Sequence, residues 1–234
     1  MIIVMTRGLA RQLAAASPLP AVLTVLEFRT MFANVDLEDT RAARREATRE
    51  RILQAAWDLA RRDGLAAITL RQVARQVGMR APSLYTYFES KNAMYDAMYA
   101  QAAQDLAATL ARRPQASDPR QRLRGRMRLF TGFCVADPVR YQLLLERPVP
   151  GFEPAPESFQ ITVAALAATR GDLQAAGVGD EPAVDLFRAL ITGLVSLQIA
   201  NDPGGDRWTR LQDGALDMFL AHHATPAQHP PKGR

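Results

Sequence analysis

Apolar residues recur at helical spacing along most of this chain, and no stretch alternates apolar and polar residues as a half-buried strand does. The clearest stripe has the spacing i, i+3, i+4, i+7, which marks one face of an amphipathic helix. Thr69 stands just before it and Gln72 follows three residues later, the spacing of a capping box. Gly78 comes directly after the stripe, where a helix normally ends. The stripe consists of Leu70, Val73, Ala74 and Val77.

A second helical segment begins after a turn of only three residues, 78–80. It starts near Pro82, because proline is favoured in a first helical turn, and runs to Phe88. Leu84 and Phe88 are four residues apart, so both can point into a core. Ser90 then caps a third helix. Two helices joined by so short a turn predict a helix-turn-helix, which places its second helix in the major groove of DNA.

The side chains that this second helix leaves toward solvent are small, hydroxylated or cationic. Such side chains meet base edges, thymine methyl groups and phosphate oxygens. Lys91 lies in the first turn of the third helix, where a cation opposes the helix dipole, so a phosphate partner explains it better than local stabilisation. The alternative is a solvated helical hairpin with no role in DNA binding. The residues expected toward solvent are Arg80, Ala81, Ser83, Thr86 and Tyr87.

The run ITLRQVARQVGMRAPSLYTYFESKNAMYDAM, residues 68–98, resembles the DNA-binding domain of the TetR family of bacterial transcriptional regulators. The preceding segment 48–64 resembles the family's first helix, and the likeness covers about residues 48–95. The chain departs from the family pattern at Arg80, usually a small hydroxyl residue, and at Tyr87, more often histidine. Sequence preference therefore does not carry over. The residues expected to contact DNA are Arg45, Thr69, Arg71, Arg80, Ala81, Ser83, Thr86, Tyr87 and Lys91.

The resemblance implies an all-α fold with an N-terminal three-helix helix-turn-helix domain and a C-terminal helical bundle for dimerisation and ligand binding. We expect the DNA-binding domain at residues 41–95, the effector-binding and dimerisation domain at 96–224, and a disordered tail at 225–234. Residues 1–40 form an extension that is an upstream start, a tail or an extra helix packed on the body. Pro18 and Pro20 break any long helix there.

Arginine clusters near the predicted DNA-binding domain. The net charge is +5, which favours a polyanionic partner. Arg41, Arg44 and Arg45 precede or open the first helix, expected near 42–62, and form a basic arm able to reach phosphates or a minor groove. Arg61 and Arg62, in contrast, are expected on a solvated helix face.

The region after Pro114 is expected to contain five helices. Asp118-Pro119 and Asp137-Pro138 each place an N-cap before a proline at the first helical position. Asp180 begins another such capped helix. The helices are expected near residues 120–136, 139–147, 157–176, 180–200 and 206–222.

The last two long helices are apolar on more than one side, so each is expected to be buried on more than one side. TetR-like proteins pair by packing two such helices against two, which implies a homodimer on a palindromic operator. The alternative is a thick monomer core. The expected dimer residues are Leu186, Leu190, Gly193, Leu194, Leu197, Leu216 and Phe219.

The resemblance also implies a mostly apolar effector pocket in the larger domain. An effector shifts the protein between two states through its differential affinity for them. The alternative for each aromatic residue is simple core packing. The pocket residues expected from the helical pattern are Phe130, Phe133, Cys134, Tyr141, Phe159 and Gln198.

Several other classes lack their usual residues. Cys134 is the single cysteine, and the three histidines lie within the last thirteen residues, so zinc sites and histidine-based catalysis are not expected. We expect no metal, no cofactor, no enzymatic activity and no membrane partner, and a cytoplasmic location. The predicted function is a DNA-binding regulator, a repressor released by a small apolar or amphipathic effector. The alternatives are a helical small-molecule-binding protein or enzyme, and an architectural DNA binder without a ligand.

Overall fold

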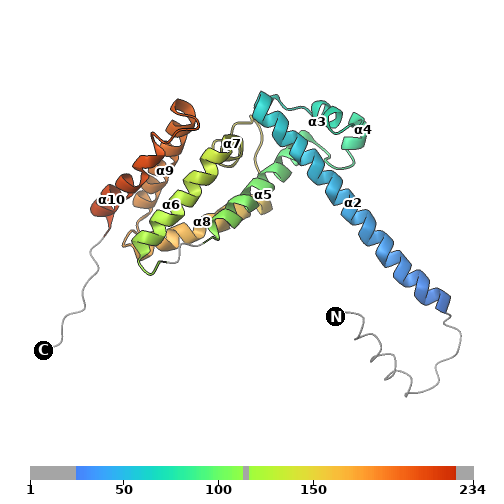
Figure 1. Cartoon of the computed structure of the whole chain (residues 1–234), viewed down its shortest axis with the longest axis horizontal. Helices are drawn as coiled ribbons and strands as arrows, with labels where there is room; N and C mark the ends of the chain where they lie inside the picture. The colour runs from blue at the N-terminus through green and yellow to red at the C-terminus, as the bar shows by residue number, and fades with distance from the viewer. Residues whose placement is uncertain (1–24, 113–115, 225–234) are drawn as a thin grey trace, which may run out of the picture. The chain divides into compact units, whose positions relative to one another are not determined.

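The computed structural model describes residues 25–112 and 116–224, and it describes side chains from residue 40 onward in the same ranges. Every regular element among these residues is an α-helix or a 3₁₀-helix, which confirms the all-α prediction (Figure 1). The expectations for Pro18, Pro20 and the tail at 225–234 lie outside the described residues.

The chain divides into two compact units, residues 1–50 and 51–234. Helix α2 spans Val25–Asp63 and belongs in part to each. It begins well before the predicted start near residue 42, because no proline or glycine interrupts the chain between Val25 and Asp63. It ends where predicted, since Gly64 follows with a φ of 86° and its amide donates to the Ala60 carbonyl at 2.9 Å.

The remaining α-helices lie close to the predicted positions, except that α4 (Ala81–Leu84) ends before Phe88 and α10 (Gln212–His223) begins later than residue 206. The others are α3 (Leu70–Gln76), α5 (Lys91–Leu110), α6 (Pro119–Ala136), α7 (Pro138–Leu145), α8 (Pro156–Ala175) and α9 (Glu181–Asn201). Two 3₁₀-helices that the sequence did not predict are η2 (Leu65–Ala67) and η3 (Thr209–Leu211). The side chains of Asp118, Asp137 and Asp180 each accept a backbone amide at a helix start, which confirms the three predicted caps.

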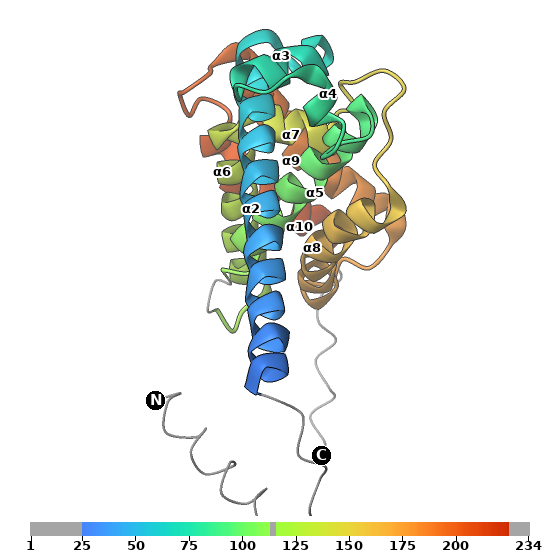
Figure 2. The same ribbon diagram turned by 90° about the vertical axis from the view of Figure 1, so that its right-hand side faces the viewer.

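Helix α6 is the centre of the second unit, because it packs against α5, α7, α8, α9 and α10. Helix α5 runs along α8, with which it makes its most extensive contact (Figure 2). The α9–α10 pair lies at the end of this unit away from α3 and α4 (Figure 1). The same unit therefore carries the helix-turn-helix at one end and the apolar α9–α10 pair at the other.

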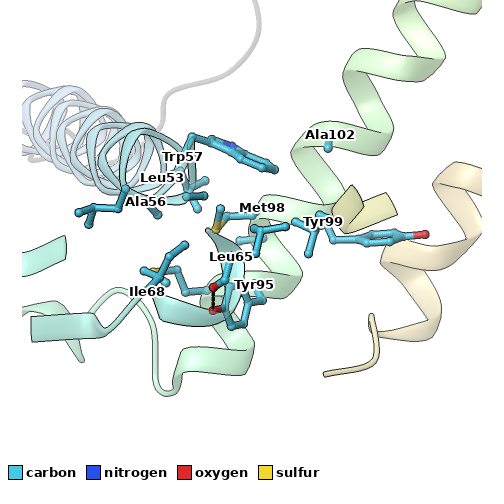
Figure 3. Close-up of a cluster of buried hydrophobic side chains, with 14 of the residues drawn as sticks. Leu53, Ala56, Trp57, Leu65, Ile68, Tyr95, Met98, Tyr99 and Ala102 are labelled. Carbon is cyan, nitrogen blue, oxygen red and sulfur yellow. Dashed lines mark hydrogen bonds between the residues drawn. The ribbon is translucent and has the colours of Figure 1, made fainter. Parts of the chain in front are cut away.

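A buried cluster joins the end of α2 to α5 (Figure 3). Trp57 is fully buried there, and its indole N–H donates to the Gln101 side chain at 2.7 Å. The Tyr95 hydroxyl donates to the Leu65 carbonyl, and burial raises the pKa of Tyr95 to about 12. The cluster thus fixes the turn before α3 against α5 through one buried polar contact.

By length and composition alone, one helix among the described residues, α9, could cross a membrane. A core helix of a globular protein passes the same test. One face of α9 is buried in the second unit, with Phe187 and Val195 nearly inaccessible, while Leu186 and Leu197 on another face are exposed.

Candidate functional site

The helix-turn-helix is built by local hydrogen bonds that the sequence specifies. The Thr69 hydroxyl accepts the Gln72 amide, and the Gln72 side chain accepts the Thr69 amide, so the predicted capping box is formed. Gly78 has a φ of 72°, and the Met79 amide donates to the Ala74 carbonyl at 2.8 Å. This is the six-to-one bond of a Schellman motif, which turns the chain sharply after α3.

The second helix is shorter than predicted. Regular α-helix ends at Leu84 rather than Phe88. The Thr86 amide then bonds to the Ser83 carbonyl and the Tyr87 amide to the Leu84 carbonyl, both three residues back. This tightened turn still buries Leu84 and Phe88 as predicted. The recognition element is therefore one α-turn followed by a tighter turn.

The tightened turn decides which of two tyrosines is exposed to solvent. Tyr87 was predicted to face solvent, but it is half-buried and packs against the core, and Tyr85 is instead 54% exposed. With three residues per turn, residue i+3 lies over residue i, so Tyr87 falls above the buried Leu84. At ideal α-helical spacing the two tyrosines lie about equally far from the buried face, which is why the sequence did not separate them.

A surface depression lies where the start of α3, the recognition turn and the start of α5 meet. It brings together Thr69, Arg71 and Lys91, three of the residues predicted to contact DNA, and adds Tyr85. These four side chains offer a hydroxyl, a guanidinium, a phenol and an ammonium group, all able to donate to a phosphate oxygen. The complete lining is Thr69, Leu70, Arg71, Tyr85, Glu89, Ser90 and Lys91.

Lys91 has a local role that the sequence reasoning discounted. Its ammonium donates to the Ala66 carbonyl at 3.1 Å and lies 5.3 Å from the centre of the Tyr95 ring. The unfavourable helix dipole at this position is therefore no argument against a local role for Lys91, because the carbonyl acceptor and the aromatic face offset the cost of placing a cation there. An ammonium has three donors, so Lys91 can hold η2 and also face a phosphate.

The other predicted DNA contacts are mostly accessible. Arg80, Ser83 and Thr86 are exposed and Ala81 is half-buried, while Arg45 is exposed in the first unit. Three exposed arginines of the helix-turn-helix make no ion pair with any residue that the structure describes. They are Arg71, Arg75 and Arg80.

Arg61 and Arg62 differ from those arginines. Arg61 pairs with Asp58 at 3.1 Å and with Asp137 at 2.7 Å. Arg62 pairs with Asp63 at 2.8 Å. Both side chains are already engaged on the helix surface, in agreement with their assignment to a solvated face.

The predicted dimer residues separate into two groups. Leu186 and Leu197 are exposed, and Leu190 and Gly193 half-exposed, along one stripe of α9. The other three, Leu194, Leu216 and Phe219, are buried inside the chain's own core. Leu211, at the end of η3, and Met218 on α10 are exposed at 47% and 69%, and neither is among the expected dimer residues.

A cavity of about 150 Å³ lies between α6, α8, α9 and the end of α7. Phe130 is the predicted pocket residue that lines it. One polar lining residue interrupts an apolar stripe of α8, because Arg170 lies four residues after Leu166 and three before Leu173. Such interruptions are the sequence signal that could have located the cavity. The complete lining is Arg126, Met127, Phe130, Leu145, Leu166, Thr169, Arg170, Leu173, Val184, Phe187, Arg188, Ile191 and Thr192.

The other predicted pocket residues lie elsewhere. Cys134 and Tyr141 pack with Val195, and Phe133 partly covers them. Gln198 is buried, and its side-chain oxygen accepts the backbone amides of Trp208 and Thr209 at the start of η3. Phe159 is 49% exposed on α8. The sequence pattern identified inward-facing residues but not which of them border an unfilled space.

Two findings bear on catalytic and metal chemistry. Burial raises the pKa of the Cys134 thiol, so this cysteine stays protonated and is a poor nucleophile. Among residues 25–112 and 116–224, no group of three histidine, cysteine or carboxylate side chains is arranged to hold a metal ion.

Comparison with known proteins identifies the helix-turn-helix. Residues 52–98 match the family model of the bacterial regulatory proteins of the tetR family. The HTH-type transcriptional regulator Rv1816 of Mycobacterium tuberculosis is 32% identical over 124 residues, which make up 50% of this chain and 53% of the relative. The regulator Mb1846 of Mycobacterium bovis matches to the same extent. The match thus spans about half the length of these curated relatives.

Solved structures share the fold. The regulatory protein SCO4313 superposes with a TM-score of 0.64 at 23% identity, over 77% of this chain and 98% of its own. PfmR, a TetR family transcriptional regulator from Thermus thermophilus, gives a TM-score of 0.55 at 19% identity, over 73% of this chain and 97% of its own. The likeness to these structures extends beyond residues 52–98 to most of the chain, and at such identities it shows the fold alone.

Proposed function

We propose that this chain, a transcriptional regulator of the TetR family, is a repressor that binds a palindromic operator as a homodimer. A small apolar or amphipathic effector then releases it from the DNA. The DNA-binding part rests on the helix-turn-helix, and the release rests on the cavity between α6, α8 and α9.

One observation carries the DNA-binding role: Thr69, Arg71, Tyr85 and Lys91 converge on one surface depression beside the recognition turn. A site with hydrogen-bond donors from two helix starts and one turn is suited to clamp the sugar-phosphate backbone, which fixes the register of a protein on DNA. The exposed Arg80, Ser83 and Thr86 lie on the turn and recognition element itself, where they are available to base edges. Arg45 and its neighbours in the first unit would supply additional phosphate contacts.

The homodimer is supported by the apolar stripe that α9 leaves exposed. Leu186, Leu190, Gly193 and Leu197 recur at i, i+4, i+7 and i+11, a spacing that keeps one helix face toward a partner. Leu211 and Met218 are further exposed apolar residues, on η3 and α10, the elements that pack against α9. Two recognition helices about one duplex turn apart would then match an operator with two-fold symmetry.

The cavity favours a ligand-responsive regulator over a ligand-free architectural DNA binder. An occupied cavity changes the packing of α6 against α8 and α9, and α6 also contacts α5, which follows the helix-turn-helix directly. An effector moves the DNA-binding equilibrium only by binding one arrangement of these helices more tightly than the other.

The DNA-binding role is tested by the salt dependence of binding to a labelled duplex of random sequence. Arg71→Gln removes one exposed phosphate contact from each subunit, so the slope of log affinity against log salt should fall by about one unit per bound subunit. Arg62→Gln is the matched control, since Arg62 is also exposed but pairs with Asp63 outside the depression. Equal slopes for Arg71→Gln and wild type, with folding intact, would contradict the proposed site.

A further inference from the structure

We infer that the cavity between α6, α8 and α9 takes a small organic anion: a carboxylate on an apolar body of about one aromatic ring. The claim that this ligand is the effector rests on the proposed function. The claim that the cavity binds such a ligand is independent of it, because that claim follows from the walls, size and charge of the cavity alone.

The walls of the cavity are apolar and set the size of the ligand. Phe130, Leu173, Phe187 and Ile191 contribute aromatic and aliphatic surface from three helices. The volume of about 150 Å³ is that of a well-studied engineered cavity which binds benzene. A single ring, or an alkyl chain of similar volume, therefore fills the apolar part without displacing core side chains.

The charged residues that line the cavity are all cationic. Three of its lining residues are arginines, Arg126, Arg170 and Arg188, and none is aspartate or glutamate. A cationic ligand would have no carboxylate to pair with on these walls, and a buried unpaired charge is strongly unfavourable. An anionic ligand, in contrast, can bind to the guanidinium groups of these arginines, which form bidentate hydrogen bonds with carboxylates.

Arg126 is the most informative of the three because it is only 4% exposed. Its guanidinium lies 2.9–3.0 Å from one oxygen of Asp172 and 3.4 Å from the Leu110 carbonyl. Asp172 also accepts a bond from Arg122 at 2.9 Å. Two arginines thus share one carboxylate, which leaves an excess positive charge beside the cavity that a ligand carboxylate would balance.

The other two arginines form the outer edge of the cavity. Arg170 pairs with Glu181, and Arg188 with Asp185 at 3.2 Å, through side chains that are all at least 40% exposed. Exposed pairs of this kind contribute little stability and are easily exchanged. Thr169 and Thr192 add hydroxyl groups to the same lining. A ligand can therefore place its ring among the apolar walls and its carboxylate near these arginines.

The direct test is calorimetric titration of the full-length protein, without DNA, with benzoate, benzamide and benzylamine. The three share the ring and differ in charge. We expect benzoate to bind at least about tenfold more tightly than neutral benzamide, because charge-assisted hydrogen bonds are roughly twice as strong as neutral ones. Benzylamine should bind most weakly. Equal affinity for the three, a preference for benzylamine or no binding of benzoate would overturn the inference.

Variants locate the binding. Arg126→Gln should weaken benzoate binding by about tenfold and leave benzamide binding little changed, whereas Arg128→Gln, an exposed arginine on the same helix paired with Asp213, should change neither. Because Arg126 is buried, its variant is first checked for thermal unfolding. The double variant Arg170→Gln, Arg188→Gln lowers the charge at exposed positions and tests the same point if Arg126→Gln does not fold.

A cavity-filling variant, Ile191→Trp, separates this inference from the proposed function. It should abolish benzoate binding. If benzoate binds wild type but leaves its DNA affinity unchanged, the ligand class stands and the effector role fails. If benzoate binds Ile191→Trp as well as wild type, the ligand lies elsewhere and the inference fails, whatever happens to DNA binding.

Discussion

At the scale of single residues, local hydrogen bonding decides which side chains reach the surface. The turn after α4 tightens to three residues, and this places Tyr87 over the core and Tyr85 in the depression beside Arg71 and Lys91. We therefore propose different roles for the two tyrosines: Tyr87 packs under the recognition turn, and Tyr85 contacts DNA.

The two tyrosines provide a matched pair of variants. Tyr85→Ala should weaken operator binding by about 1–3 kcal/mol per subunit, the range for one good contact, with little change in thermal stability. Tyr87→Ala should lower the unfolding temperature, because it removes a packed aromatic ring. Fluorescence anisotropy and thermal denaturation measure the two effects. Normal DNA binding by a folded Tyr85→Ala variant would remove this residue from the interface.

Tyr95 offers a prediction about alkaline pH. Its folded-state pKa of about 12 lies above the ordinary value of 10, so its contribution to stability is complete below pH 10 and is lost as the pH rises toward 12. Tyr95→Phe removes one of two hydrogen bonds to the Leu65 carbonyl, which keeps only the Ile68 amide at 3.4 Å, and should cost about 1 kcal/mol near neutral pH.

That cost of Tyr95→Phe should shrink as the pH passes from about 10 to 12. Urea unfolding of wild type and variant across this range measures it. The difference between the two proteins isolates Tyr95 from Tyr99 and Tyr141, whose pKa values are also raised by burial. A difference that stays constant over the range would show that Tyr95 is not the titrating group.

At the scale of elements, the sequence predicts what depends on neighbouring residues and misses what depends on packing. The positions of four helix starts could be predicted from their N-cap residues, because a cap is a hydrogen bond within a few residues of the chain. These residues are Thr69, Asp118, Asp137 and Asp180. The start of α2 at Val25 was missed, although Thr24 and Glu27 have the spacing of a capping box in the sequence. The helix-turn-helix was predictable because its bonds are local.

In the candidate sites, too, the residues that depend on local sequence were predictable and those that depend on packing were not. Thr69, Arg71 and Lys91 were predictable from the motif, whereas Tyr85 required the geometry of the tightened turn. The ligand cavity was missed apart from Phe130, because an unfilled space depends on how four helices meet. Helical spacing shows which way a side chain points but not what lies opposite.

The exposed stripe of α9 leads to a prediction about the dimer. Leu197→Arg or Met218→Arg places a charge on the proposed interface, where burial without a partner is strongly unfavourable, and should give a folded monomer. These positions are better tests than Leu194 or Phe219, which are buried in the chain's own core. Analytical ultracentrifugation at micromolar concentration measures the outcome.

Val163→Arg is the control for the dimer prediction, because Val163 is an exposed apolar residue on α8 outside the stripe. It should leave the dimer intact. A wild-type protein that sediments as a monomer would refute the dimer itself, and a dimer that survives Leu197→Arg and Met218→Arg would place the interface elsewhere.

At the scale of the whole molecule, the second unit carries the helix-turn-helix, the exposed apolar stripe of α9 and the cavity. The arginines at 41–51 extend the basic character of the chain toward the N-terminus. Their exposure is consistent with contact to phosphates, and their contribution can be measured apart from that of the helix-turn-helix.

Two N-terminal deletions separate the extension from the basic arm. Removal of residues 1–30 leaves the helix-turn-helix and the arginines at 41–45, so DNA binding should persist. Removal of residues 1–45 also takes away Arg41, Arg44 and Arg45, and should lower both affinity and the salt dependence of binding. Loss of folding or binding in the shorter deletion would show that the removed segment is part of the packed structure.

The most direct test of the central claim is selection from a genomic library: fragments retained by the purified protein are sequenced. We predict enrichment of a small set of sites that share an inverted repeat, with enrichment lost for Tyr85→Ala and Arg71→Gln. The protein should occupy each site as two subunits. Retained fragments without a shared repeat, or equal retention by wild type and these variants, would contradict the claim that the chain is a dimeric, operator-binding regulator.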